Sequence, residues 1–177
     1  NYLNRLLDMK EDRYNLCGGK ENYLSVLSKI LNEYKKIVRI YATIDSYFME
    51  ELNKQMKGDL LFSELFWKKR DAKLIFNHES VEESQNLDLI KALYSEKISI
   101  NPNLKLKHTK VYLDSYEITH TLNEIIVWDY NKYLVNFNNP QIHSRHRTTG
   151  YNFNDSKICP NIIHVFENEF NKNSIAI

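Results

Sequence analysis

Cysteine, glycine and proline are scarce in this chain of 177 residues, which has two, four and three of them respectively. Cys17 and Cys159 belong to no CxxC pair, so the sequence predicts neither a disulfide framework nor a zinc motif. The only adjacent glycines, Gly18-Gly19, follow no strand and precede no Lys-Ser or Lys-Thr pair, as a phosphate-binding loop requires. Gly-x-Ser-x-Gly and His-Glu-x-x-His are also missing. These absences argue against the common nucleotide-binding, serine hydrolase and zinc protease classes, and no cofactor is expected.

Long hydrophobic runs and an excess of one charge are also missing. No apolar run approaches the ~20 residues that cross a bilayer, and the first residues do not resemble a signal peptide. The 24 basic residues nearly cancel the 23 acidic ones, so no global field draws the chain onto nucleic acid or an anionic membrane. With so few cysteines, this composition favours a soluble protein of the reducing cytoplasm with no membrane partner.

The length and the 42% apolar content favour one folded domain with one core. Leu3, Leu6 and Leu7 form a short helical stripe, which predicts a helical lead-in over residues 1–19. Residues 20–177 are expected to form a single α/β domain.

The first half of the chain alternates between helix and strand patterns. Apolar residues at intervals of three and four predict an amphipathic helix from Glu21 to Lys36. The β-branched run from Ile37 to Ala42 is typical of a buried strand, and Ala72 to Phe76 predicts a second one. Further helices are predicted over residues 48–56, 59–68 and 87–94. This order favours parallel pairing in a mixed sheet flanked by helices.

The second half is rich in strand patterns, beginning at Lys97 to Ile100. Strand-like runs follow over residues 104–113, 116–121, 124–130, 133–137 and 150–154. Turn residues between them favour hairpins, and residues 138–149 are expected to form a loop. Ser156 can cap a final helix that ends near Asn171, with Pro160 in its first turn. Its predicted buried face consists of Ile158, Ile162, Val165, Phe166 and Phe170.

Two polar groups are candidates for ligand binding. The first follows the strand at residues 37–42, where open α/β sheets bind ligands, and consists of Thr43, Asp45 and Ser46. The second is the basic loop, which contains His143, Arg145, His146 and Arg147. Its guanidinium and imidazole groups can bind an anionic small ligand or nucleic-acid phosphate, although an ordinary solvated loop would have the same composition. His143 and His146 lack a third ligand nearby, so no metal site is expected.

A third candidate is His108-Thr109-Lys110, followed by Asp114. Alternation along a strand places His108 and Lys110 on the same face. The pattern resembles the phospholipase D signature, in which a His-x-Lys pair holds a phosphate while the His attacks phosphorus. The resemblance implies His108 as nucleophile and His120 as acid, in a dimer with one signature per chain. Lys110, together with Arg145, would then bind the phosphate. Asp114 comes one residue early and no Gly-Ser-x-Asn follows, and a solvated strand face is the other interpretation. His78 and His164 look isolated.

A second alignment with the same signature lies further along the chain. Leu122, Glu124 and Asp129 then stand at the positions of the His, Lys and Asp, with another strand at Tyr133 to Val135. The segments 124–137 and 150–155, and a helix containing Phe166-Glu167, resemble the end of phospholipase D-like domains. This resemblance implies an inactive branch of the superfamily, because a leucine side chain cannot attack phosphorus. It is similar in plan to the effector domain of TrmB-like transcription regulators, which carry a winged helix ahead of that domain.

The leading hypothesis is therefore a non-catalytic sensor or interaction domain of phospholipase D-like fold. It is expected to be a homodimer and the effector part of a transcription regulator or multi-protein system. One alternative is a dimeric phosphodiesterase or nuclease that uses His108. Another is a nucleic-acid-binding adaptor that uses Arg145 and Arg147.

Overall fold

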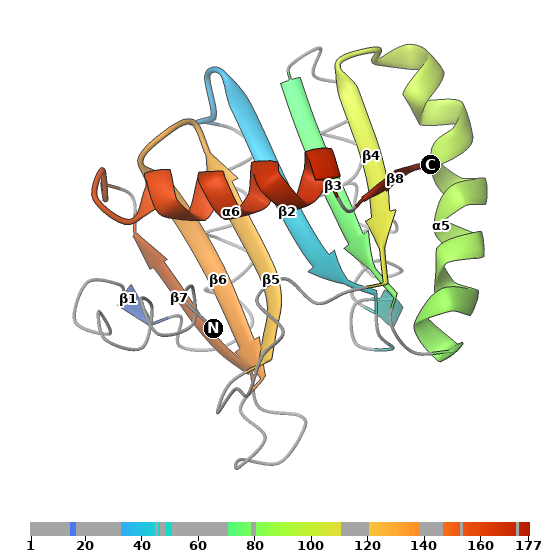
Figure 1. Cartoon of the computed structure of the whole chain (residues 1–177), viewed down its shortest axis with the longest axis horizontal. Helices are drawn as coiled ribbons and strands as arrows, with labels where there is room; N and C mark the ends of the chain where they lie inside the picture. The colour runs from blue at the N-terminus through green and yellow to red at the C-terminus, as the bar shows by residue number, and fades with distance from the viewer. Residues whose placement is uncertain are drawn as a thin grey trace.

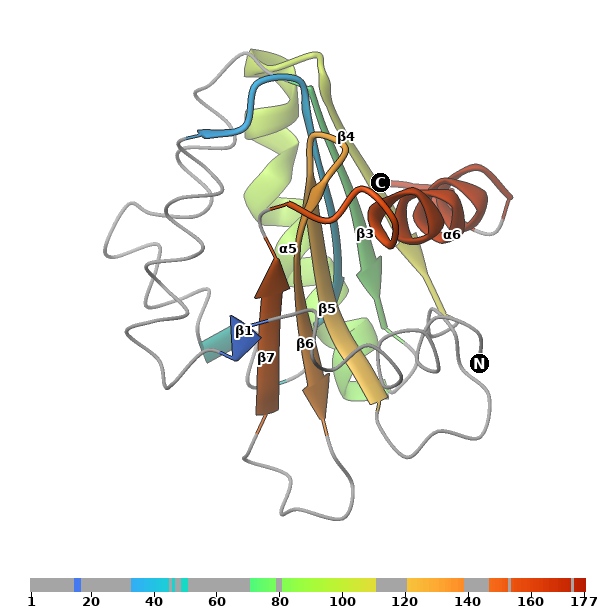
Figure 2. The same cartoon turned by 90° about the vertical axis from the view of Figure 1, so that its left-hand side faces the viewer.

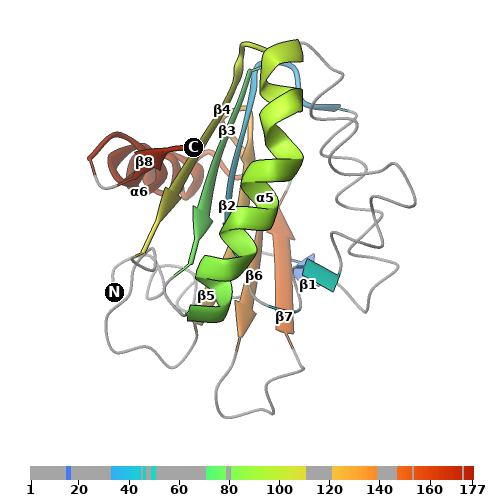
Figure 3. The same ribbon diagram turned by 90° about the vertical axis from the view of Figure 1, so that its right-hand side faces the viewer.

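The computed structural model describes residues 15–16, 33–44, 46, 49–50, 71–78, 81–110, 121–138, 147–152, 154–172 and 174–177. In this part of the chain, one sheet of eight strands lies between two helices, α5 (Val81–Ile100) and α6 (Cys159–Lys172) (Figure 1). The helices cover opposite faces of the sheet, as Figure 2 shows from one side and Figure 3 from the other. Neither is long and apolar enough to cross a membrane.

The strands are β1 (Asn15–Leu16), β2 (Ile37–Thr43), β3 (Asp71–Asn77), β4 (Leu104–Thr109), β5 (Thr121–Trp128), β6 (Lys132–Asn138), β7 (Arg147–Asn152) and β8 (Ile175–Ala176). Their order in the sheet is β1-β7-β6-β5-β2-β3-β4-β8. The central strands β2, β3 and β4 are parallel, and the other pairs are antiparallel. This mixed sheet with a helix on each face confirms the predicted fold class.

Side-chain alternation divides the core into two layers. On the α5 face, residues such as Ile40, Leu74 and Leu106 pack with Leu87 and Ile90 of the helix. On the α6 face, the core contains Tyr41, Ile75, Ile125, Val127, Tyr133 and Val135 from the strands, with Ile158, Ile162, Phe166 and Phe170 from the helix and its entry. Because both faces are covered, β2 and β3 are largely apolar in sequence, whereas β4 alternates between apolar and polar residues.

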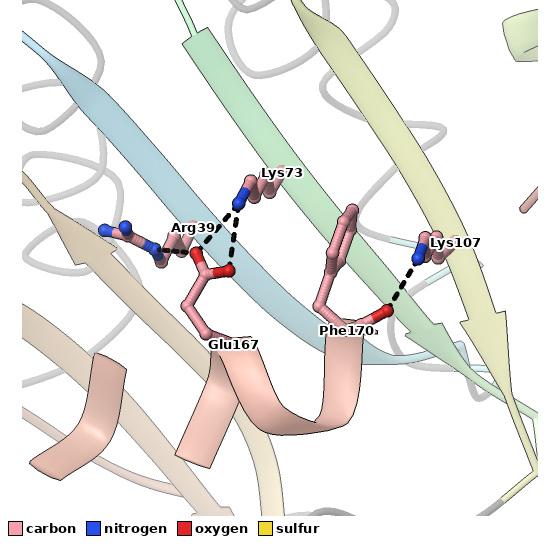
Figure 4. Close-up of polar contacts among 5 residues, drawn as sticks. All are labelled: Arg39, Lys73, Lys107, Glu167 and Phe170. Atoms are coloured by element: carbon pink, nitrogen blue, oxygen red, sulfur yellow. Dashed lines mark hydrogen bonds and ion pairs between the residues drawn. The ribbon is translucent and has the colours of Figure 1, made fainter. Parts of the chain in front are cut away.

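Charged residues hold α6 against the sheet (Figure 4). Arg39 and Lys73 are register partners on β2 and β3, and both bind the Glu167 carboxylate. Arg39 Nε donates at 2.6 Å and Lys73 Nζ at 2.9 Å. Lys107 of β4 donates to the carbonyl oxygen of Phe170 at 2.7 Å, and its ammonium lies 4.3 Å from the Phe170 ring centroid. The helix is therefore held by its apolar face and by three cations from three adjacent strands.

The entry of α6 is capped by Asp155, where the sequence favoured Ser156. Asp155 Oδ1 accepts hydrogen bonds from the amides of Lys157 and Ile158, at 3.0 and 2.9 Å. An aspartate can satisfy these otherwise unpaired amides and also interacts favourably with the helix dipole. Pro160 lies in the first turn, as predicted.

Most predicted elements are confirmed where the structure describes them, including β2, β3, the β5–β6 hairpin and α6. One was wrong: Lys97 to Ile100 begins no strand region, because these residues form the last turn of α5. Helix α5 also extends beyond the predicted residues 87–94. The expected loop ends earlier than predicted, since Arg147 opens β7. The helices expected over residues 59–68 and most of those over 21–36 and 48–56 lie outside the described residues.

The predicted lead-in is described only at Asn15 and Leu16, which form the edge strand β1 paired with β7. The helical stripe expected from Leu3 to Leu7 lies outside the described residues. Whether residues 20–177 form a domain of their own stays a prediction.

Glu167 provides a test of how α6 is held. Partial burial opposes its ionisation, yet the hydrogen bonds from Arg39 and Lys73 outweigh burial and lower the pKa of Glu167 below 4.5. Glu167→Gln should lower the free energy of unfolding by about 1–2 kcal/mol, a figure reduced for partial exposure, because it leaves buried Arg39 without its carboxylate. The loss should appear in urea denaturation at pH 7 and shrink as the pH falls below 4.5, where wild-type Glu167 itself becomes protonated.

Asp88→Asn, which removes an exposed carboxylate from α5, is the matched control and should leave the denaturation midpoint unchanged. Equal midpoints for Glu167→Gln and Asp88→Asn would contradict the proposed role of the ion pairs.

Candidate functional site

Two histidines meet at the carboxyl ends of β3 and β4. His78 follows β3, and His108 is the fifth residue of β4. His78 Nε2 and His108 Nδ1 are 2.8 Å apart, and the ring centroids are separated by 4.9 Å. His78 Nδ1 also lies 3.2 Å from Ser84 Oγ, in the first turn of α5. This His–His–Ser cluster is the candidate site.

The hydrogen bonds of Ser84 determine where the protons lie in this cluster. Ser84 Oγ donates its single hydrogen to the carbonyl oxygen of His78 at 3.1 Å, so it can only accept from His78 Nδ1–H. His78 Nε2 then has a lone pair and accepts from His108 Nδ1–H. His108 Nε2 is left unprotonated, and no residue of the described chain bonds to it. This nitrogen is the one free lone pair of the cluster.

Both imidazoles favour the neutral form. Burial lowers the pKa of His78 below 6.5, with Lys110 as the next influence. Burial also lowers the pKa of His108, and the neighbouring His78, Lys91 and Lys110 lower it further. Glu83 opposes the shift at His78 only weakly. The cluster therefore lies in a positive potential created by lysines of α5 and of the β4 end.

Among the signature residues of the first alignment, the structure describes His108 and Lys110. Lys110 follows β4 directly and is exposed. His108 is half-buried. Asp114 and His120 lie outside the described residues, so a completed His-Lys-Asp set stays a prediction.

Thr43, at the end of β2, lies on the face of the sheet opposite to the two histidines. Thr43, Asn77 and Thr109 are register partners across β2, β3 and β4, and all three are buried. Asn77 Nδ2 donates to the Tyr41 hydroxyl at 2.8 Å, which places this polar row on the α6 face. Thr43 is thus separated from His78 and His108 by the sheet itself. Ser46 is exposed, and Asp45 lies outside the described residues.

The basic loop is described only where β7 begins. Arg147 pairs with Asn138 at the end of the β6–β7 pair where the connecting segment leaves the strands. His143, Arg145 and His146 lie outside the described residues. Within the described part, no group of three or more His, Cys, Asp or Glu side chains could hold a metal ion.

The residues of the second alignment lie on β5 and in the turn that follows it. Glu124 is 9% exposed and pairs with Ala42 of β2. The row continues from Ala42 to Phe76 and His108, so Glu124 and His108 occupy the same face three strands apart. Leu122 precedes Glu124 by two residues on the same strand.

Asp129 has a structural role in the turn after β5. Its φ of 56° lies in the left-handed region, which aspartate tolerates better than most residues. Its carboxylate accepts from the amides of Lys35 and Lys36, at 2.8 Å for Lys36, and its own amide donates to Ile37 at 2.8 Å. Asp129 therefore fixes the start of β2 against the end of β5.

His78 is the functional candidate that sequence reasoning missed. It looks isolated in the sequence because its partner lies 30 residues away. The available signal was the parallel pairing of two strands, one followed by a histidine and the other with a histidine next to its last residue. Cys159, in contrast, is buried, and burial raises the pKa of its thiol to about 12, so it is no nucleophile in this state.

No protein-family model matches the sequence, and no curated protein matches it either. Several solved structures are similar in fold. The archaeal chromatin protein TrmBL2 superposes with a TM-score of 0.60 at 12% identity over 98% of this chain and 61% of its own. NucT from Helicobacter pylori has a TM-score of 0.51 at 8% identity, over 93% of this chain and 97% of its own. Phosphatidylserine synthase from Haemophilus influenzae has a TM-score of 0.51 at 11% identity, over 92% of this chain and 38% of its own.

These likenesses show a phospholipase D-like fold, as the resemblance in the sequence implied. The chain spans about three fifths of the length of TrmBL2. The neighbours include both a DNA-binding chromatin protein and a lipid-synthesising enzyme, so the fold is shared by different activities.

The lowered pKa values of the two histidines predict a pH-dependent stability. The folded state holds His78 and His108 neutral, whereas the unfolded chain protonates them at the ordinary value of 6.5. Their contribution to the free energy of unfolding should be complete above pH 6.5 and should fall as the pH drops through the folded-state pKa values. Urea denaturation at intervals from pH 8 to pH 5 measures this slope.

The double variant His78→Gln/His108→Gln should lose the dependence of the free energy of unfolding on pH. His164→Gln, at an exposed position of α6, should keep it. A double variant that retains the full wild-type slope between pH 6.5 and 5 would show that other groups are responsible.

Proposed function

We propose that this chain is a non-catalytic sensor or interaction domain of phospholipase D-like fold. The observation that carries the proposal is Glu124, a buried acid on β5 where the resemblance calls for the lysine that binds phosphate. A carboxylate repels a phosphodiester at short range, and the repulsion is largest where water is excluded. Leu122, at the position of the nucleophile, has no lone pair with which to attack phosphorus.

The sequence around these residues supports the same interpretation. The second alignment requires a strand, a turn containing an aspartate and another strand, and β5, Asp129 and β6 have this arrangement. Asp129 retains a structural function through its bonds to the amides before β2. A sheet with this arrangement but without the reactive pair suits a domain that uses its sheet for binding.

The regulatory part of the proposal is motivated by the fold shared with TrmBL2, which is described as an archaeal chromatin protein with a novel mode of DNA binding. In this proposal, the domain acts as the effector part of a DNA-associated regulator in the cytoplasm, as a homodimer, and an anionic partner contacts the loop that contains Arg145 and Arg147.

His108 motivates the rival function. The bonds from Ser84 through His78 leave His108 Nε2 unprotonated, which is the state a nucleophile or general base needs. In the rival function, two chains would each supply His108 and Lys110 to one phosphodiesterase site.

An assay for phosphodiester cleavage distinguishes these functions. The wild-type protein, incubated without metal with bis(p-nitrophenyl) phosphate and with single-stranded DNA, should release no product above the buffer background, because Leu122 and Glu124 cannot perform the displacement. His108→Ala should behave identically, and a purified phosphodiesterase verifies the substrates. Cleavage by the wild type that disappears in His108→Ala would overturn the proposal in favour of the rival.

The basic loop has a separate test. Arg145→Ala/Arg147→Ala should weaken binding to a single-stranded DNA oligonucleotide and reduce the slope of log K against log salt, by about 0.7 for each lost phosphate contact. Fluorescence anisotropy at several salt concentrations measures both. Lys172→Ala, which removes an exposed cation from the end of α6, is the matched control. Equal affinities and slopes in all three proteins would remove the loop from the proposal.

A further inference from the structure

One hydrogen-bond acceptor of the His78–His108 pair, His108 Nε2, takes no part in the hydrogen bonds of the cluster. His108 Nδ1–H and both nitrogens of His78 are occupied within the cluster. His108 Nε2 is free, and it is absent from the buried polar atoms of the described residues, so it is open to solvent. A histidine that served packing alone would not need its second nitrogen positioned in this way by two further side chains.

The surroundings of this nitrogen are cationic. Lys110 comes two residues after His108, directly after the end of β4, and its positive charge lowers the pKa of both His78 and His108. Lys91 of α5 also raises the potential at His108. Glu83 is the acid that influences His78, and it is buried and engaged in interactions of its own. The free nitrogen therefore lies where negative charge is favoured.

We propose that His108 and Lys110 form a binding site for a sulfate- or phosphate-type oxyanion, whose binding draws a proton from solvent onto His108 Nε2. The bound state has an imidazolium N–H and an ammonium as two charge-assisted donors. His108 Nδ1–H continues to donate to His78 Nε2, so the rest of the hydrogen-bond chain is unchanged. No bond to the anion is covalent, and one proton is taken up for each anion bound.

The spacing of the donors favours a tetrahedral anion over a small planar one. His108 lies on β4 and Lys110 follows the end of that strand, so the two side chains approach a ligand from separate points of the backbone. A group with oxygens in several directions can accept from both donors at once. The site is on β4, at the edge where α/β sheets bind ligands, and is distinct from Leu122 and Glu124 on β5.

This inference rests on the proposed sensor function, because it names the class of ligand that the domain binds. It gives that function a dependence on pH: acidification protonates His108 and strengthens binding. The two proposals fail separately, since turnover of a phosphodiester would contradict the sensor function, whereas the experiment below measures binding alone.

Sulfate is the sharpest probe, because it remains a dianion from pH 5 to pH 8 and any pH dependence must come from the protein. Isothermal titration of the whole chain with sodium sulfate at constant ionic strength should give a Kd about tenfold lower at pH 5.5 than at pH 7.5, corresponding to about one unit of pKa change in the bound state. Titration in two buffers of different ionisation enthalpy should show net proton uptake when sulfate binds.

Three variants test the assignment. His108→Gln keeps a polar side chain that does not titrate, so its weaker binding should be independent of pH. Lys110→Ala should weaken binding at both pH values while keeping the pH dependence. His164→Ala, on exposed α6 on the other face of the sheet, should behave as the wild type. Circular dichroism establishes that each variant is folded.

Absence of saturable sulfate binding to the wild type at both pH values, at constant ionic strength, would overturn the proposal. So would binding with the same Kd at both pH values, or binding that His108→Gln leaves unchanged. Inorganic phosphate, titrated under the same conditions, then determines whether phosphate is preferred to sulfate.

Discussion

The in-register pairing of β2, β3 and β4 is the constraint on which the rest of the structure depends. Because side chains alternate along each strand, this register assigns every central residue to the α5 face or the α6 face. A slip of one residue between β3 and β4 would exchange these faces, bringing Lys107 in place of His108 against α5. The same register places Arg39 beside Lys73, where one carboxylate of α6 reaches both. Helix attachment and histidine pairing thus have a common origin.

The carboxyl edge of the parallel strands has different chemistry on its two faces. On the α6 face, Thr43, Asn77 and Thr109 form a buried neutral row. On the α5 face, buried His78 and partly exposed His108 form a titratable pair. The neutral row supports the fold at any pH. The histidine pair, on the other face of the same edge, changes its charge with pH. This separation explains why a fold known in enzymes can keep its sheet while its chemistry changes.

The sequence predicted the parts of the fold that depend on local pattern. The β-branched runs identified β2 and β3, and the turn residues around Asn131 identified the β5–β6 hairpin. The end of α5 was missed because Lys97 to Ile100 alternates like a strand, and the helix ends only where Asn101 precedes Pro102. His108 could be chosen from its spacing to Lys110, but its contact with His78 depends on strand register, which no short motif contains. Asp45, Asp114, His120 and most of the basic loop lie outside the described residues, so their roles remain predictions.

Cys159 begins α6 and is buried against the sheet, with Asp155 beside its thiol. A thiol in this position reacts with alkylating reagents only when the helix lifts from the strands. The chain therefore contains a natural reporter of that opening, and the rate of its labelling would give the free energy with which the last helix is docked, without any foreign group attached.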